Sequence, residues 1–127
     1  MGGMVNNNYG HRKMIVWQNL DAVEMMIQRK ILPHIPKNQF NIIDQMDRAC
    51  SSSVANFIEG FYSGAIKEYL RFLGYSRRSL AELQDWVRRV YIKQFIPESI
   101  YVEFDDLSGK THFLLNRLVN ALKRKIS

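Results

Sequence analysis

The sequence has few of the residues that crosslink, break or anchor a chain. Of its 127 residues one is cysteine and three are proline, and the 12 acidic residues are fewer than the 18 lysines and arginines. A single thiol, Cys50, cannot form an internal disulfide, which fits a reducing compartment. No apolar run approaches the roughly 18 residues of a membrane helix, and the start lacks the apolar core of a signal peptide. We therefore expect a soluble cytoplasmic protein that does not enter a membrane.

The residues that are present predict one folded domain. Hydrophobic residues make up 46% of the chain, which is enough to build a core at this length. Residues 1–11 are rich in glycine and asparagine and are expected to form a flexible leader, and residues 12–127 are expected to form the domain. The formal net charge of +6 favours an acidic partner such as nucleic acid.

Apolar residues recur at intervals of three and four, the spacing of amphipathic helices. The first helix is expected to end in "LPHIP", because proline blocks helical continuation. The second is expected to be capped by Asn38 and ended by Gly60. The third is expected over about 65–95, and the fourth from Pro97 to the end. The inward stripes of the first three are Val16, Leu20, Val23, Ile27 and Ile31; Ile42, Met46, Ala49, Ser53 and Phe57; and Tyr69, Phe72, Ser76, Leu80, Leu83, Val87 and Val90.

Strand alternation, linkers and internal repeats are not evident. Four amphipathic helices joined by short breaks predict an all-α fold, an antiparallel up-down four-helix bundle.

Several motifs suggest chemistry but fit packing better. In "SSSVANFIEGF" a nucleophilic serine would need a base and an oxyanion site, and the strained G-x-S-x-G elbow is missing, so helix packing and capping are favoured. "LSGKTHF" ends like a phosphate-binding loop but has Phe104 where the first glycine should stand. The histidines and the cysteine lack metal-ligand spacing. These residues are His11, His34, His112 and Cys50. We expect no catalytic residue, no metal site and no cofactor.

The cations follow a pattern of their own. At about 100° per residue, the third helix gathers Lys67, Arg71, Arg78 and Arg89 on the side opposite its apolar stripe. Arg77, Arg88 and Lys93 extend this basic face, and the fourth helix repeats Lys110, Arg117 and Arg124 every seven residues. A solvated helix surface would explain such a face, but phosphate binding is the favoured interpretation.

The fourth helix also has a wide apolar arc. Its members are Leu107, Leu114, Leu115, Leu118, Val119, Ala121, Leu122 and Ile126. They span about 160°, more than the roughly 100° stripe that one core contact requires. Self-association would cover the excess, so we predict an oligomer interface at Leu115, Val119, Leu122 and Ile126.

Two segments carry a family resemblance. "QMDRACSSSVANFIEGF" and "KEYLRFLGYSRRSLAELQ" resemble the bacterial four-helix bundle family that includes the protein encoded in large-subunit ribosomal RNA intervening sequences and the accessory variability determinant of diversity-generating retroelements. The resemblance covers about residues 14–125. It implies a basic, ring-shaped homopentamer that binds RNA or DNA, with a reverse transcriptase as a partner of the retroelement member. It implies no catalytic residues.

Two functions therefore remain open from sequence. One is a noncatalytic, oligomeric nucleic-acid-binding protein, either associated with intervening-sequence RNA or acting as an accessory factor of a reverse transcriptase. The other is a protein-interaction scaffold that does not bind nucleic acid directly and whose positive charge mainly gives solubility.

Overall fold

A computed structural model describes residues 10–127 of the chain. Within that range it contains four α-helices and no strand, so the expected all-α fold is confirmed. The helices are α1 (Ile15–Met26), α2 (Phe40–Phe61), α3 (Ile66–Ile92) and α4 (Glu98–Ile126). Of the expected leader, residues 1–9 lie outside the described residues, and Gly10 and His11 belong to a short 3-10 helix, η2 (Gly10–Lys13).

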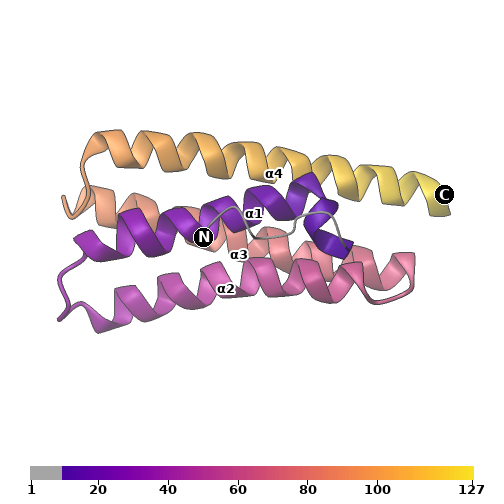
Figure 1. Cartoon of the computed structure of the whole chain (residues 1–127), viewed down its shortest axis with the longest axis horizontal. Coiled ribbons are helices and arrows are strands. Elements are labelled where there is room, and N and C mark those ends of the chain that lie inside the picture. Colours follow the sequence, from indigo (N-terminus) through magenta and orange to yellow (C-terminus); the bar gives the residue numbers. More distant parts are fainter. Residues whose placement is uncertain (1–9) are drawn as a thin grey trace, which may run out of the picture.

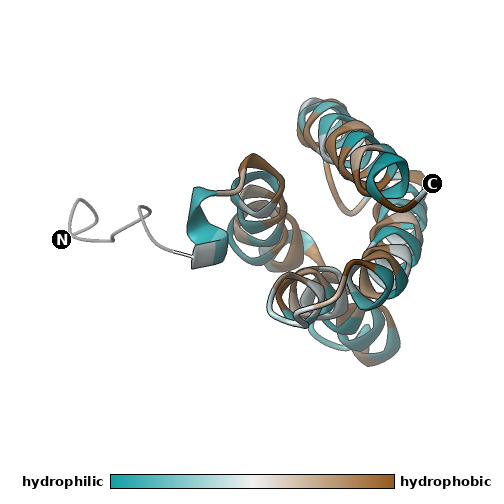
Figure 2. Cartoon of the chain, turned by 90° about the vertical axis from the view of Figure 1, so that its right-hand side faces the viewer, coloured by the Kyte–Doolittle hydropathy of each residue, from teal (hydrophilic) through white to brown (hydrophobic). Residues whose placement is uncertain are grey.

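The four helices lie side by side along the long axis of the molecule. Each helix contacts the next along the chain, and α4 returns to contact α1. In Figure 1 the sequence colours advance leftward along α1 and α3 and rightward along α2 and α4. Figure 2 views the chain end-on and shows the helices around a common interior.

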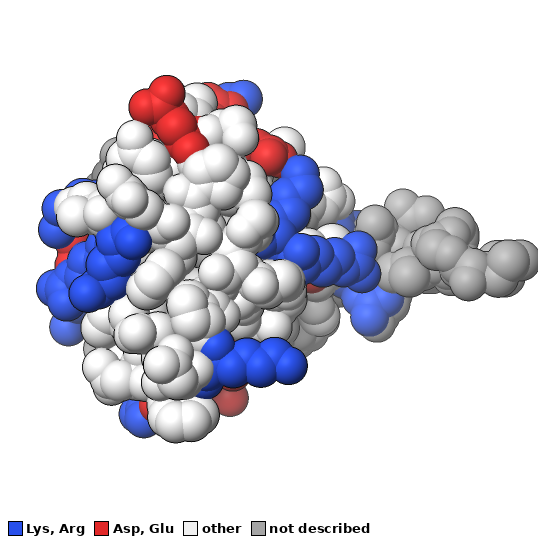
Figure 3. Space-filling model, turned by 90° about the vertical axis from the view of Figure 1, so that its left-hand side faces the viewer, with Lys and Arg blue, Asp and Glu red and all other residues white. Residues whose placement is uncertain are grey.

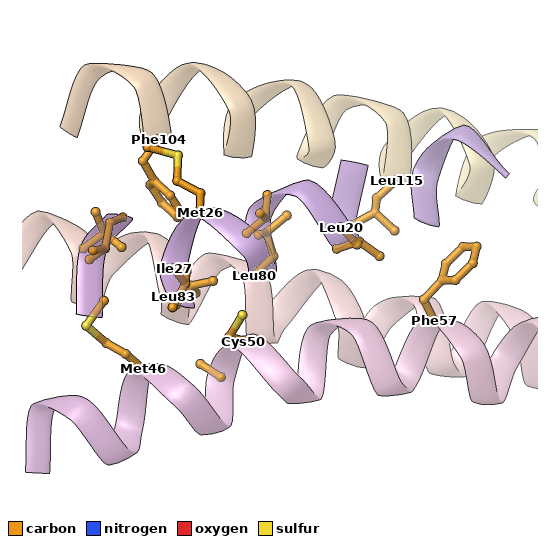
Figure 4. Packing of buried hydrophobic residues seen from close by; sticks show 14 of the residues in the cluster. Leu20, Met26, Ile27, Met46, Cys50, Phe57, Leu80, Leu83, Phe104 and Leu115 are labelled. Carbon is orange, nitrogen blue, oxygen red and sulfur yellow. The ribbon is translucent and has the colours of Figure 1, made fainter. Parts of the chain in front are cut away.

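That interior is filled by apolar side chains from all four helices. Leu20, Phe57, Leu80 and Leu115 come from α1, α2, α3 and α4 in turn, and each is 0% exposed. Figure 4 shows side chains of this cluster between the ribbons. Burying one such side chain stabilises the fold by about 1.5–3 kcal/mol, so the predicted stripes account for much of the driving force. The inward residues predicted for the first two helices are all buried.

Helices α2 and α3 pack closely where Gly60 faces α3. Gly60 is buried inside α2, and a Cβ at this position would lie 2.9 Å from the Cβ of Phe72 and 3.2 Å from the carbonyl oxygen of Tyr69. The hydroxyl of Ser76 also donates to the carbonyl oxygen of Ser53 at 2.6 Å. The predicted end of α2 is correct to within one residue, because the helix ends at Phe61. The role of Gly60 differs from the expectation, because its missing side chain allows the close contact with α3.

The ends of the predicted helices differ from expectation in three places. α1 ends at Met26, and the chain continues as a π-helical turn, η3 (Ile27–Ile31), and a 3-10 turn, η4 (Leu32–His34). The N-cap of α2 is Gln39 rather than Asn38, and it has no side-chain capping bond. α3 ends at Ile92, short of the expected position, and Tyr69 and Phe72 on its stripe are half-buried whereas Leu73 is fully buried.

Candidate nucleic-acid interface

The expected basic face of α3 exists, but part of its charge is already paired. Nη2 of Arg71 lies 2.7 Å from Oε2 of Glu68, and its Nε donates to Oε1 at 3.1 Å. The hydrogen bond from Arg71 lowers the pKa of Glu68 and keeps it ionised. Arg71 also donates to the hydroxyl of Tyr75 at 3.1 Å. An approaching phosphate would meet this carboxylate as well as the guanidinium, which weakens the attraction.

The same pairing occurs further along α3. Asp85 accepts from Arg88 at 3.2 Å and from Arg89 at 2.9 Å. Asp85 lies four residues before Arg89, the spacing at which ion pairs form on a helix. Arg78 instead lies over the ring of Tyr75, 5.1 Å from its centroid. Exposed pairs of this kind contribute little to stability, and their main effect is to reduce the net charge of the face.

Two arginines lie in a groove between α3 and α4, and none of the acidic residues that the structure describes lines this groove. Its volume is about 330 Å³, and small residues of α3, Gly74 and Ala81, leave room for it. The polar groups that line it are Arg77 and Arg78 from α3 and His112 and Asn116 from α4. We call this the α3–α4 groove.

Contacts inside the α3–α4 groove hold its donors in place. Nη1 of Arg77 donates to Oδ1 of Asn116 at 2.8 Å, which fixes one end of the guanidinium and leaves its other N–H groups to bind. Nε2 of His112 is buried and has no hydrogen-bond partner among the described residues. Burial, and secondarily the charge of Arg77, lower the pKa of His112. The imidazole is therefore neutral near neutral pH, and the positive charge of the groove comes from the two arginines.

The other predicted cations are spread over the surface. Lys67 is exposed at the start of α3, and Lys93 is exposed just after its end. On α4, Lys110 pairs with Asp106 at 3.2 Å, Arg117 lies 5.9 Å from the ring centroid of Phe113, and Arg124 is in the exposed last turn. Figure 3 shows the end of the bundle that carries the α3–α4 connection, where lysines and arginines lie at the sides of an uncharged centre and acidic residues lie along its upper edge. The structure brings together Arg77 and Arg78 in one groove, not all ten predicted residues.

The predicted oligomer interface needs correction. Leu115, Val119 and Leu122 are 0%, 3% and 7% exposed and form part of the protomer's own core. Leu107, Leu114 and Leu118 pack partly against the same core. The arc is wide because α4 contacts both α1 and α3. Of the four predicted interface residues only Ile126 is exposed, at 47%.

The serines of "SSSVANFIEGF" make packing contacts. The hydroxyl of Ser53 donates to the carbonyl oxygen of Cys50 at 2.7 Å, and Ser52 is 2.8 Å from the hydroxyl of Ser79 on α3. Burial, followed by the nearby Glu24 and then Asp47, raises the pKa of the Cys50 thiol to about 12. Within residues 10–127, no group of three or more histidine, cysteine, aspartate or glutamate side chains is placed to hold a metal ion. None of the helices in that range has the length and apolar content to cross a membrane.

Fold and surface together define a class: a small four-helix protein with a cationic groove between two of its helices. The chain belongs to the 23S rRNA-intervening sequence protein family, whose model matches residues 12–117. This family is not known as a catalytic one. No curated protein matches the chain. The family named from "ANFIEG" and "SLAEL" is thus confirmed in its intervening-sequence branch.

Proposed function

We propose that this chain is a noncatalytic nucleic-acid-binding protein, in which antiparallel up-down four-helix protomers form a ring-shaped homopentamer that binds RNA through its phosphates. The observation that carries the proposal is the α3–α4 groove, where two guanidinium groups line a surface that has no carboxylate. Arginine donors in a fixed geometry suit phosphate oxygens. The description of the family, which refers to ribosomal RNA, favours RNA as the acidic partner.

Exposed apolar side chains support assembly. Ile15 and Met25 on α1 are 59% and 43% exposed, and Val102 and Phe113 on α4 are 59% and 61% exposed. A contact between copies would remove this surface from water at a gain of about 25 cal/mol for each Å² buried. A ring would also repeat the groove around an axis, so that several weak phosphate contacts act together. DNA as a second ligand and a reverse transcriptase as a partner are narrower proposals that the family resemblance adds.

The test of RNA binding is its dependence on salt. We expect labelled RNA to bind with an affinity that falls steeply between low and moderate salt, because binding releases counterions from the phosphates. The double variant Arg77→Gln/Arg78→Gln should weaken binding and reduce the slope of log K against log salt by about 2, one for each lost phosphate contact. Fluorescence anisotropy at several salt concentrations measures both quantities.

A matched control removes the same charge elsewhere. Arg29 and Lys37 are exposed and lie outside the α3–α4 groove, in η3 and in the connection before α2. The variant Arg29→Gln/Lys37→Gln should keep the wild-type slope. If both variants lose affinity equally, the groove is not the site, and RNA binding that is absent or indifferent to salt refutes the proposal.

One observation favours the scaffold alternative. The carboxylates Glu68, Asp85 and Asp106 pair with four of the ten predicted cations. Because these pairs reduce the net positive charge of the basic face, the face could serve solubility rather than phosphate binding. The salt titration separates the two functions, since a scaffold has no salt-dependent affinity for RNA.

A further inference from the structure

A second groove lies on the other side of α3, against α2. It has a volume of about 300 Å³ and is lined by Gln45, Arg48, Ala49, Ser52, Ser79 and Glu82. We call it the α2–α3 groove. Ligand pockets usually range from roughly 300 to 1,000 Å³, so this groove has room for a small planar group rather than a large ligand.

The α2–α3 groove differs chemically from the basic α3–α4 groove. It combines a guanidinium, a carboxylate, an amide and two hydroxyls. The hydroxyls of Ser52 and Ser79 are 2.8 Å apart, and the side-chain amide of Asn56 donates to Ser52 Oγ at 3.0 Å. These bonds fix the serines between the helices. A lining with donors and acceptors of both charges suits a neutral group that has both kinds of hydrogen-bonding edge.

The two charged groups of the α2–α3 groove are open to a ligand. The closest ion-pair contact of Arg48 is Asp44, at a long 3.7 Å, and its side chain is 73% exposed. Glu82 lies four residues after Arg78, a spacing at which ion pairs form on a helix, but within residues 10–127 its carboxylate forms no ion pair, because Arg78 lies over Tyr75. Neither the Arg48 nor the Glu82 side chain would have to give up a strong ion pair to bind a ligand.

Aromatic residues stand beyond both ends of the groove on the same side of α3. Tyr75 is four residues before Ser79, and Trp86 is four residues after Glu82, spacings that place neighbours on one helix face. A guanidinium lies over each ring: Cζ of Arg78 is 5.1 Å from the centroid of the Tyr75 ring, and Cζ of Arg89 is 4.8 Å from the centroid of the Trp86 ring. Aromatic rings and guanidinium planes are the surfaces on which unpaired bases stack.

We propose that the α2–α3 groove binds an unpaired guanine of the nucleic acid, with the Glu82 carboxylate accepting from the two adjacent N–H groups of its Watson–Crick edge and Arg48 donating to O6 and N7. Guanine offers these donors and acceptors on different edges of one base. The base must be unpaired, because in a duplex its Watson–Crick edge is occupied. This inference rests on the proposed function and adds a preference for one base to binding that phosphates alone would leave indifferent to sequence.

The test uses short labelled oligoribonucleotides and fluorescence anisotropy. The probes are a heptamer of uridines and the same heptamer with guanine, inosine or adenine at its centre. We expect the guanine heptamer to bind roughly tenfold more tightly than the uridine heptamer, the scale of one good bidentate base contact. Inosine lacks the 2-amino group and should lose part of that factor, and adenine should lose all of it.

Glu82→Gln should abolish the preference for guanine. The glutamine side chain has an NH₂ donor where the carboxylate had an acceptor oxygen, so one of the two guanine N–H groups would face a donor instead of an acceptor. The affinity of this variant for the uridine heptamer should change no more than that of the control Glu59→Gln, which removes an equal negative charge from an exposed residue outside the groove. Circular dichroism checks that both variants fold; Glu82 is exposed, so we expect no loss of structure.

The outcomes separate the two proposals. If the uridine heptamer binds with salt dependence but guanine gives no advantage, or if Glu82→Gln keeps the advantage, this inference is refuted and the proposed function stands. If none of the oligonucleotides binds, the proposed function fails, and the inference fails with it.

Discussion

Replacing Gly60 with alanine should loosen the contact between α2 and α3. In an open helix the change stabilises by about 1 kcal/mol through helix propensity. At Gly60 the new Cβ would lie 2.9 Å from the Cβ of Phe72 and 3.0 Å from Cδ1 of Tyr69, and its third neighbour is the backbone carbonyl of Tyr69 at 3.2 Å. Backbone cannot move aside as a flexible side chain does, so we expect an overpacking cost of about 1–3 kcal/mol.

Gly109 supplies the matched control. It lies inside α4, and a Cβ there would have no neighbour within 4 Å. Gly109→Ala should therefore show the propensity gain alone, and the difference between the two variants, about 1–3 kcal/mol, isolates the packing cost. Urea unfolding at a fixed protein concentration measures this difference, because oligomers unfold in a concentration-dependent way. Equal stabilisation by both substitutions would refute the close approach of α2 and α3.

Two further changes test the core and the groove. Leu115→Ala should lower the free energy of unfolding by about 2–5 kcal/mol, whereas Ile126→Ala should change it by under about 1 kcal/mol. If urea unfolding shows an equally small effect for both variants, Leu115 is not buried in the core. His112 has a lowered pKa in the folded chain, so the unfolded chain binds its proton more readily and stability should fall as the pH drops below the ordinary value of 6.5. Urea midpoints at about pH 7 and about pH 5 should differ less in His112→Asn than in the wild type, and an identical difference would contradict the burial of the imidazole.

The sequence predicted the helices well, because apolar residues buried on one face of a helix recur every three or four positions. Every residue of the α2 stripe from Ile42 to Phe57 is buried, as its three- and four-residue spacing indicated. The role of Gly60 was not predictable in the same way. A glycine after an apolar run is typical of a helix end, and the contact that requires it comes from Tyr69 and Phe72 on another helix.

The candidate site was less predictable, because it depends on contacts between helices. Arg77 and Asn116 are 39 residues apart, and no local pattern joins them. The basic face of α3 was overestimated for a reason that the sequence did contain. Glu68 lies three residues before Arg71, and that spacing predicts an ion pair.

The wide apolar arc of α4 was misinterpreted. The angular width of an apolar arc is a property of one helix, and it does not show how many neighbouring helices cover that arc. In the structure α1 and α3 share the arc, and Leu115 and Val119 face the interior. Surface available for a contact between copies lies instead at scattered exposed residues such as Phe113.

The central claim is that RNA binds over the groove between α3 and α4, and ultraviolet cross-linking with peptide mapping tests it most directly. A uridine-rich RNA bound to the wild-type protein at low salt should cross-link to peptides that contain residues 74–78 and 112–116. The variant Arg77→Gln/Arg78→Gln should lose these cross-links at the same RNA concentration, since the guanidinium groups that line the groove are gone. Cross-links confined to α1 and to residues 32–39, unchanged in that variant, would contradict the account.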